Sequence, residues 1–246
     1  MYRIGVDIGS TYTKYCALNT GSAEQTLFME KTEAFQKNYF IKKVAELKKE
    51  YPDAEIISCG YGRDNIASVK TINELSALAI GVNSKYPEFN TVLDIGGQDS
   101  KVICQKDGKL QKFYLNDRCA AGSGMFLTNT LSYLGMDYKD IDLDRIHDES
   151  IRLSSVCAVF AQSEVVRLVA DNTPPNDIIY AVLWHILSQS KKLIDKVDTE
   201  QVFITGGMTN VLGIHKICER ALGVKCVVAN KGSYLAAIGC AHGNCA

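Results

Sequence analysis

Two short segments of the chain repeat the same residues at the same spacing, and both contain groups that bind phosphate. Residues 7–14 read DIGSTYTK and residues 94–101 read DIGGQDSK, so Asp, Ile, Gly and Lys coincide when the segments are aligned. Glycine lets the backbone approach a ligand closely, and consecutive N–H groups at a turn can hold phosphate oxygens. Carboxylates such as Asp7 and Asp94 can hold the water shell of Mg²⁺. The repeat therefore predicts two phosphate-binding hairpins, which would hold a polyphosphate from both sides.

The two hairpins also provide residues for a phosphoryl-transfer reaction. Asp7 and Asp94 are expected to position the metal shell, and Gln98 or Asp99 to orient the attacking water, with Gln98 preferred. A glutamine suffices because phosphoryl transfer relies mainly on positioning and charge stabilisation. Lys14 is a candidate phosphate contact, although a lysine in such a hairpin can also be a plain surface charge. The residues expected to contact the phosphates are Gly9, Ser10, Thr11, Tyr12, Thr13, Lys14, Gly96, Gly97 and Gln98.

A later glycine pair completes the set of candidate ligand contacts. Gly206 and Gly207, in VFITGGMTN, lie between a predicted strand and a predicted helix, where backbone can pack on a flat ring. Alone, this pair would be a common turn, just as a single Gly-containing hairpin would be. As the third member of a set it predicts ligand contacts by Gly206, Gly207, Met208 and Asn210. The chain has no GxxxxGK[ST] loop and no GxGxxG that opens a helix, which excludes the Walker and Rossmann motifs.

Nine cysteines are scattered through the chain, and two of them stand in unusual settings. An odd number of thiols, scattered through a chain of this length, argues against a disulfide framework and for a reducing cytoplasm, and the lack of a CxxC pair argues against a zinc ribbon or a thioredoxin-type site. Cys119 (in LNDRCAAGSGMF) and Cys157 (in SSVCAVFAQSEV) each lie just before a predicted helix, and a helix start favours the thiolate that ligates metal. Either can instead be a small buried apolar residue. Cys240 and Cys245, near the C-terminus, have no motif around them and are interpreted as structural, with a mildly reactive surface thiol as the alternative for each.

Cys119 and Cys157 are too few for an iron–sulfur cluster in a single chain. A [4Fe–4S] cluster needs about four thiolates. A twofold dimer would resolve the shortage, because a second copy would supply the same two thiolates across an isologous interface. The expected site is one [4Fe–4S] cluster shared by two chains.

The elements that would position these residues run from strands to helices twice along the chain. Strands are expected at 3–8, 13–18, 26–30, 54–58, 91–95, 100–105, 110–115, 202–205 and 225–228, and helices at 37–50, 74–86, 124–134, 158–169, 175–196, 211–222 and 233–242. This order predicts an α/β fold with two similar halves that meet near residue 88.

The composition narrows the functional classes. The 27 Lys and Arg residues nearly balance the 28 Asp and Glu residues, which gives no electrostatic case for nucleic acid or an anionic membrane. The opening residues MYRIGVDIGS read as a strand rather than a signal peptide, and no run of about 18 apolar residues occurs. We therefore expect a cytoplasmic protein that binds neither nucleic acid nor membrane.

Taken in order, the two hairpins and the glycine pair resemble the phosphate and adenosine motifs of the acetate kinase, sugar kinase, Hsp70 and actin superfamily. The resemblance implies two ribonuclease-H-like domains with an ATP cleft between them, and a last helix that packs on the first domain. It places the first domain at residues 1–88 plus 229–246 and the second at residues 89–228.

The segments around Cys119 and Cys157 resemble one branch of that superfamily. They are similar to the activators, or component A, of 2-hydroxyacyl-CoA dehydratases, in the BadF, BadG, BcrA and BcrD type of ATPase, which includes the reductases of double-cubane cluster proteins. The resemblance implies a homodimeric ATPase that uses ATP, Mg²⁺ and one [4Fe–4S] cluster per homodimer, held by Cys119 and Cys157. Ferredoxin or flavodoxin would supply low-potential electrons, and a partner iron–sulfur dehydratase or reductase would receive them. Such a cluster would be oxygen-sensitive.

Two other functions stay open on the sequence. A small-molecule kinase, for a sugar or an acyl substrate, would use the same fold without a cluster and would purify as a colourless monomer. A non-enzymatic regulator would bind ATP and tolerate the loss of both Cys119 and Cys157.

Overall fold

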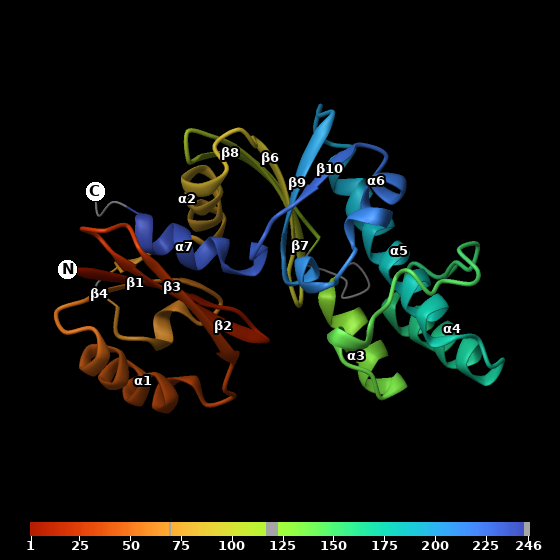
Figure 1. The fold of residues 1–246 in the computed structure, drawn as a ribbon, viewed down its shortest axis with the longest axis horizontal. Coiled ribbons are helices and arrows are strands. Elements are labelled where there is room, and N and C mark those ends of the chain that lie inside the picture. The colour runs from red at the N-terminus through yellow and green to blue at the C-terminus, as the bar shows by residue number, and fades with distance from the viewer. Residues whose placement is uncertain (69, 117–122, 244–246) are drawn as a thin grey trace. The chain divides into compact units, whose positions relative to one another are not determined.

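The computed structural model describes residues 1–68, 70–116 and 123–243 of the chain. Its strands form two five-stranded sheets, with the orders β3-β2-β1-β4-β5 and β10-β9-β6-β7-β8 (Figure 1), which confirms the expected α/β fold. The strands are β1 (Tyr2–Ile8), β2 (Tyr12–Asn19), β3 (Gln25–Lys31), β4 (Glu55–Gly60), β5 (Lys70–Thr71), β6 (Thr91–Ile95), β7 (Ser100–Lys106), β8 (Lys109–Asn116), β9 (Gln201–Gly206) and β10 (Lys225–Val228). The α-helices are α1 (Gln36–Glu50), α2 (Glu74–Lys85), α3 (Gly124–Leu134), α4 (Ala158–Ala170), α5 (Pro175–Ile194), α6 (His215–Leu222) and α7 (Leu235–His242).

Contacts divide the chain into two compact units. The first comprises Met1–Asn90, Ile103–Lys112 and Ser233–Ala246, and the second comprises Thr91–Val102 and Phe113–Gly232. Within the described part of the chain, none of the helices combines the length and the apolarity needed to span a membrane.

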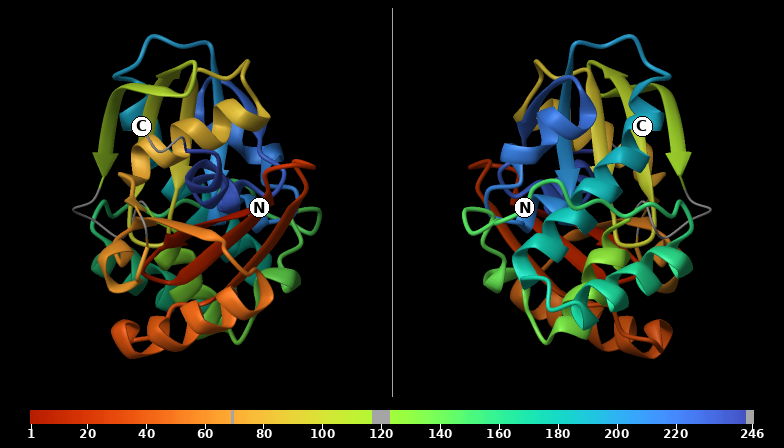
Figure 2. Two further views of the ribbon diagram at one scale, coloured as in Figure 1. Left: turned by 90° about the vertical axis from the view of Figure 1, so that its left-hand side faces the viewer. Right: turned by 90° about the vertical axis from the view of Figure 1, so that its right-hand side faces the viewer.

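In the first unit, helices cover both faces of the first sheet. Side chains alternate along β1, so Ile4, Val6 and Ile8 face α1 and pack against its residues Phe40 and Leu47. Helices α2 and α7 lie on the opposite face (Figures 1 and 2). Because both faces are covered, the central strands β1 and β4 are almost continuously buried.

Helices α2 and α7 approach each other so closely that only glycine fits at the contact. A Cβ atom on Gly81 would lie 1.8 Å from the Leu235 carbonyl oxygen, and one on Gly239 would lie 1.7 Å from the Ala77 carbonyl oxygen. This close approach buries Cys240 completely, in a cluster with Ile57 and Cys59 of β4. Cys240 is therefore a structural residue, the alternative of a surface thiol is wrong for it, and Cys245 lies outside the described residues.

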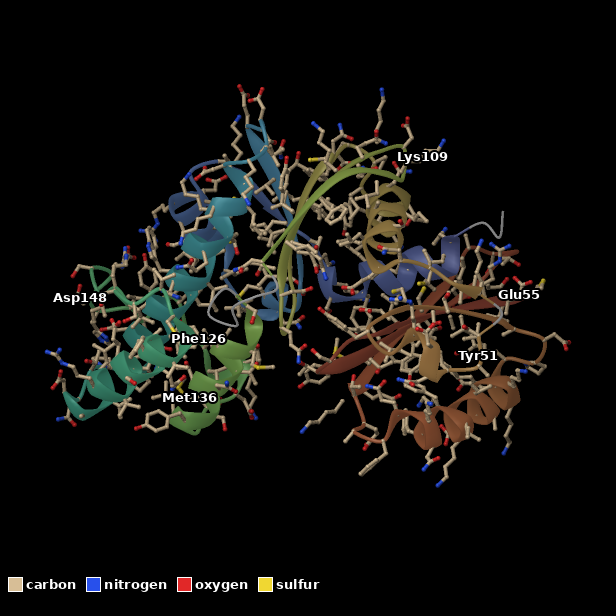
Figure 3. All side chains as sticks on the ribbon, turned by 180° about the vertical axis from the view of Figure 1, so that it is seen from behind. Tyr51, Glu55, Lys109, Phe126, Met136 and Asp148 are labelled. Atoms are coloured by element: carbon tan, nitrogen blue, oxygen red, sulfur yellow. The ribbon has the colours of Figure 1, made fainter. Side chains whose placement is uncertain are left out.

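The second unit has a core built around α5. This helix begins with Pro175, whose missing N–H has no partner to lose at a first helical position. Asp177 in its first turn is buried and accepts a hydrogen bond from the His147 backbone N–H at 2.7 Å. Phe126 of α3, labelled in Figure 3, packs edge-on against the His185 ring with centroids 5.7 Å apart.

The predicted helix at 211–222 begins later than expected. Residues 207–210 form a 3₁₀ turn, and α6 begins only at His215. Gly213 adopts φ +79°, a left-handed conformation that no α-helix contains, so the helix cannot start before it. The other expected strands and helices are found, with ends that differ by a residue or two.

Candidate functional site: two aspartate–lysine hairpins

The first predicted hairpin is formed by β1 and β2, and it brings Asp7 and Lys14 face to face. The two residues are partners in the antiparallel register, and Lys14 Nζ donates to Asp7 Oδ2 at 3.0 Å. Asp7 is 5% exposed, and its other oxygen, Oδ1, accepts a hydrogen bond from the Cys59 thiol at 3.7 Å. The carboxylate is thus held on both oxygens by groups from the strands on either side of β1.

The turn of this hairpin is fastened by Thr32, which follows β3. Thr32 Oγ1 donates to the Gly9 carbonyl oxygen at 2.8 Å and lies 3.0 Å from Thr13 Oγ1. Since the single Thr32 proton goes to Gly9, the buried Thr13 hydroxyl must donate to Thr32. The residues of the turn that remain exposed or half-buried are Gly9, Ser10, Thr11, Tyr12 and Lys14.

The second predicted hairpin is formed by β6 and β7, and it repeats the arrangement around Asp94. Lys101 Nζ lies 3.4 Å from Asp94 Oδ2 and 3.4 Å from Asp99 Oδ1. Thr205 Oγ1 donates to Asp94 Oδ1 at 2.8 Å. Gln98 is exposed at the turn, whereas Asp99 is buried beside Lys101. Of the two candidates for orienting water, Gln98 is the one that faces solvent.

The turn of the second hairpin is fastened to the start of α3. The backbone N–H groups of Gly124 and Met125 donate to the carbonyl oxygens of Gly96 and Gly97, both at 2.8 Å. Ser123 Oγ also donates to the Gly97 carbonyl at 3.0 Å. These bonds satisfy N–H groups that a helix start otherwise leaves without partners. They also tie the turn to the helix that follows the Cys119 segment.

Four residues that bind groups of these hairpins were not predicted from the sequence as site residues: Thr32, Cys59, Lys101 and Thr205. Lys101 carried a usable signal, since it aligns with Lys14 in the repeat. Thr32, Cys59 and Thr205 carried none, because each reaches its hairpin from a distant part of the chain.

The predicted glycine pair lies at the end of β9. Gly206 adopts φ +87°, and a Cβ atom there would lie 2.4 Å from the Ile95 carbonyl oxygen, so this position accepts only glycine. Gly207 is exposed with open space above its Cα, which leaves its backbone accessible to a flat ligand. Met208 is buried beneath this turn and Asn210 is exposed.

Cys157 occupies the residue immediately before α4, as predicted, and its side chain is exposed. The loop that precedes it is fixed by Glu164 of the same helix. The Glu164 carboxylate accepts hydrogen bonds from the backbone N–H of Ser154 at 2.7 Å and of Ser155 at 2.8 Å. Burial acts to raise the pKa of Glu164, but bonds from Ser154 and Ser155 outweigh it and lower the pKa.

Of the two cysteines predicted to bind the cluster, the structure describes only Cys157. Cys119 lies outside the described residues. The cysteines that the structure does describe are all free thiols. Those described residues contain no group of three or more His, Cys, Asp or Glu side chains that could bind a metal ion within one chain.

The paired hairpins, each on the first strands of a mixed sheet, define the class of nucleotide-binding proteins that contains actin, Hsp70 and the sugar kinases. The crystal structure of component A of the (R)-2-hydroxyglutaryl-CoA dehydratase of Acidaminococcus fermentans superposes with a TM-score of 0.87, at 30% identity, over 98% of this chain and 96% of that one. The activator of the 2-hydroxyisocaproyl-CoA dehydratase from Clostridium difficile, solved with bound ADPNP, superposes with a TM-score of 0.84 at 29% identity. The match covers 98% of this chain and 93% of that one.

Within that class, this chain belongs to the BadF/BadG/BcrA/BcrD ATPase family, whose model matches residues 4–242. A relative named as the (R)-2-hydroxyglutaryl-CoA dehydratase activating ATPase of A. fermentans is 33% identical over 250 residues, which cover 98% of this chain and 96% of the relative.

Proposed function

We propose that this chain is an ATP-hydrolysing iron–sulfur activator that passes low-potential electrons to a partner iron–sulfur dehydratase or reductase in the cytoplasm. The observation that carries the proposal is the pair of matching hairpins, Asp7 with Lys14 and Asp94 with Lys101, in a chain of an ATPase family. Relatives named as dehydratase activators support the class of partner. By the same resemblance, ferredoxin or flavodoxin would donate the electrons.

In this proposal both hairpins contact the phosphates of ATP. Ser10 and the backbone of the first turn, with Gly97 of the second, would donate to phosphate oxygens. The Gly96 N–H already donates to the Asp99 carbonyl oxygen at 2.9 Å, so Gly96 would contribute close backbone approach rather than a donor. Asp7 and Asp94 already bind lysine ammonium groups, so they suit a Mg²⁺ ion that they contact through its bound waters rather than by direct coordination. The exposed Gln98 would orient the attacking water, and Gly207 with Asn210 would contact the adenosine.

The cluster would be held by Cys119 and Cys157 together with the same two residues of a second copy. The described half of this donor set fits the role, because Cys157 is exposed on a loop that Glu164 fixes. The apolar side chains of Val156, Val159 and Phe160, close to Cys157 in the sequence, are exposed and would pack against the second copy. When bound, the [4Fe–4S] cluster would supply one-electron chemistry that thiol side chains alone do not provide.

The bonds between the second hairpin and α3 give ATP a route to the cluster segment. Any movement of Gly96 and Gly97 on nucleotide binding would be carried to Gly124 and Met125 through hydrogen bonds of 2.8 Å. Because α3 follows the Cys119 segment directly, a shift of this helix would change the surroundings of the cluster, which tune its potential.

The decisive experiment is anaerobic purification followed by iron and sulfide analysis. We expect a brown dimer with about four irons and four sulfides, because a [4Fe–4S] cluster has that composition. Cys119→Ala and Cys157→Ala should each lose the colour and weaken dimerisation while keeping ATP binding. Cys226→Ala is the matched control, since this thiol is half-buried and burial raises its pKa to about 12, which disfavours metal binding.

The alternatives give different results in the same preparation. A colourless monomer that phosphorylates a small molecule would establish a kinase instead. A protein that stays brown with unchanged iron in both Cys119→Ala and Cys157→Ala would refute the cluster assignment. ATP binding without turnover, in a protein indifferent to both substitutions, would indicate a regulator.

A further inference from the structure

In each unit, the hairpin aspartate accepts a hydrogen bond from a residue on the neighbouring parallel strand. That residue is Thr205 in the second unit and Cys59 in the first. In the second unit, β6 pairs in parallel with β9 so that Asp94 is the register partner of Thr205 and Ile95 that of Gly206. In the first unit, β1 pairs in parallel with β4 so that Asp7 is the register partner of Cys59 and Ile8 that of Gly60. Cys59 and Gly60 therefore occupy the positions of Thr205 and Gly206.

The glycines confirm that the two positions are equivalent. Gly60 adopts φ +88° and Gly206 adopts φ +87°. A Cβ atom on Gly60 would lie 2.5 Å from the Ile8 carbonyl oxygen, as one on Gly206 would lie 2.4 Å from that of Ile95. The Gly60 Cβ would also lie 2.8 Å from Asp7 Oδ1, so glycine leaves room for the carboxylate to turn toward Cys59.

We propose that Cys59 is a positioning residue of the first hairpin, whose thiol proton fixes Asp7 Oδ1 as the Thr205 hydroxyl fixes Asp94 Oδ1. The distances are 3.7 Å for the thiol and 2.8 Å for the hydroxyl, which suits the larger sulfur atom. With Oδ1 occupied, Oδ2 faces Lys14, and the carboxylate has one orientation instead of several. The inference rests on the proposed function, because it assigns Asp7 to the metal shell of a nucleotide.

The surroundings of Cys59 keep its thiol in the donor form. Cys59 is fully buried in a cluster with Ile57 and Cys240, where an ionised thiolate would be costly. A protonated thiol beside a carboxylate has its proton to donate, whereas a thiolate there would repel Asp7. The burial also separates this residue from the exposed Cys157, so the two cysteines have different roles.

The test compares a donor with its isostere at one position. Threonine retains a hydrogen-bond donor, and valine has the same shape without one, so the variants are Cys59→Thr and Cys59→Val. Cys16→Val is the control, because it adds the same volume at another buried thiol of the first unit. We expect Cys59→Val to raise the Mg²⁺ concentration needed for half-maximal nucleotide binding about tenfold, the scale of one hydrogen bond to a charged group. Cys59→Thr should stay within about twofold of the original chain on the same scale.

A second readout needs neither metal nor nucleotide. In metal-free protein, the decrease in Tm of the double variant Cys59→Val with Asp7→Ala should be smaller than the sum of the two single decreases, because each single variant removes one partner of the same contact. An additive result, or equal Mg²⁺ dependence of the Thr and Val variants, would overturn the role of Cys59. A coupled result with nucleotide binding that ignores Asp7→Ala would uphold the contact and refute the nucleotide site instead.

Discussion

Asp7 and Asp94 end equivalent strands, but the lysines that bind them lie in different surroundings. The Lys14 side chain is 20% exposed and is bound to the carboxylate of Asp7. The Lys101 side chain is 3% exposed and lies between two carboxylates, those of Asp94 and Asp99. The sequence repeat preserves the aspartate and the lysine, and the extra acid in the second copy comes from the one position where Asp99 replaces Tyr12.

This difference gives the two hairpins different formal charges. One carboxylate and one ammonium group cancel in the first hairpin, whereas two carboxylates and one ammonium group leave −1 in the second. A divalent cation is attracted more strongly to the second group, and a phosphate more strongly to the first. We infer that the second hairpin takes the larger share of Mg²⁺ binding and the first the larger share of phosphate binding.

The largest expected effect tests the buried lysine. Lys101→Met leaves the buried Asp99 and the half-buried Asp94 without their ammonium partner and should lower the free energy of unfolding by about 3–5 kcal/mol. Lys14→Met removes a partly exposed ammonium group, while the buried Asp7 keeps the Cys59 thiol as a donor, so it should cost less, about 1.5–3 kcal/mol. Urea unfolding followed by circular dichroism measures both. Equal losses would show that the two lysines are equivalent and would remove the basis of the comparison.

The next prediction concerns ATP turnover. Asp7→Asn and Asp94→Asn should each lower it about a hundredfold or more, equivalent to about 2.7 kcal/mol of barrier, because both remove charge from the metal shell. The loss should be larger for Asp94, because the second hairpin, with two carboxylates beside one ammonium group, takes the larger share of Mg²⁺ binding. Iron content should not change in either variant. Asp198→Asn, at an exposed position, is the control. A larger loss for Asp7 would reverse the assignment of metal and phosphate.

The hairpins were predictable from the sequence because each is local: strand, turn and strand are consecutive, at residues 2–19 in the first and 91–106 in the second. The groups that complete them were not, since Cys59 follows Asp7 by 52 residues and Thr205 follows Asp94 by 111. No local pattern encodes such a contact, which depends on the parallel pairing of distant strands. The burial of Cys240 was missed for a related reason, because the approach of α7 to α2 depends on glycines in both helices.

A smaller effect tests whether the glycines that follow the two partner residues are equivalent. Gly60→Ala and Gly206→Ala should each lower stability by about 1–3 kcal/mol, since both force a side chain into a positive φ against a carbonyl oxygen. Gly207→Ala, which meets open space, should change stability by less than about 0.5 kcal/mol. Thermal unfolding distinguishes them. If Gly60→Ala is neutral, the requirement for glycine after the residue that binds the aspartate is specific to the second unit.

The smallest expected effect is the loss of stability at acid pH that one histidine of each unit causes. His185 of the second unit is buried, and His242 of the first is half-buried. Burial is the main cause that lowers the pKa of His185 in the second unit and of His242 in the first. The unfolded chain then binds protons that the folded chain does not, so stability is complete above about pH 6.5 and falls as the pH decreases through the folded pKa, by at most about 1.4 kcal/mol per pH unit for each group.

The two histidines should differ in what protonation breaks. The Gln25 amide N–H donates to His242 Nε2 at 2.8 Å, which requires that nitrogen to be unprotonated, whereas His185 Nε2 is buried and has no hydrogen-bond partner among the residues that the structure describes. Protonation of His242 therefore costs a hydrogen bond as well as desolvation. Between pH 7 and 5.5, His242→Gln should remove more of the acid-induced loss of stability than His185→Gln. The opposite order would show that desolvation in the second unit outweighs the hydrogen bond in the first.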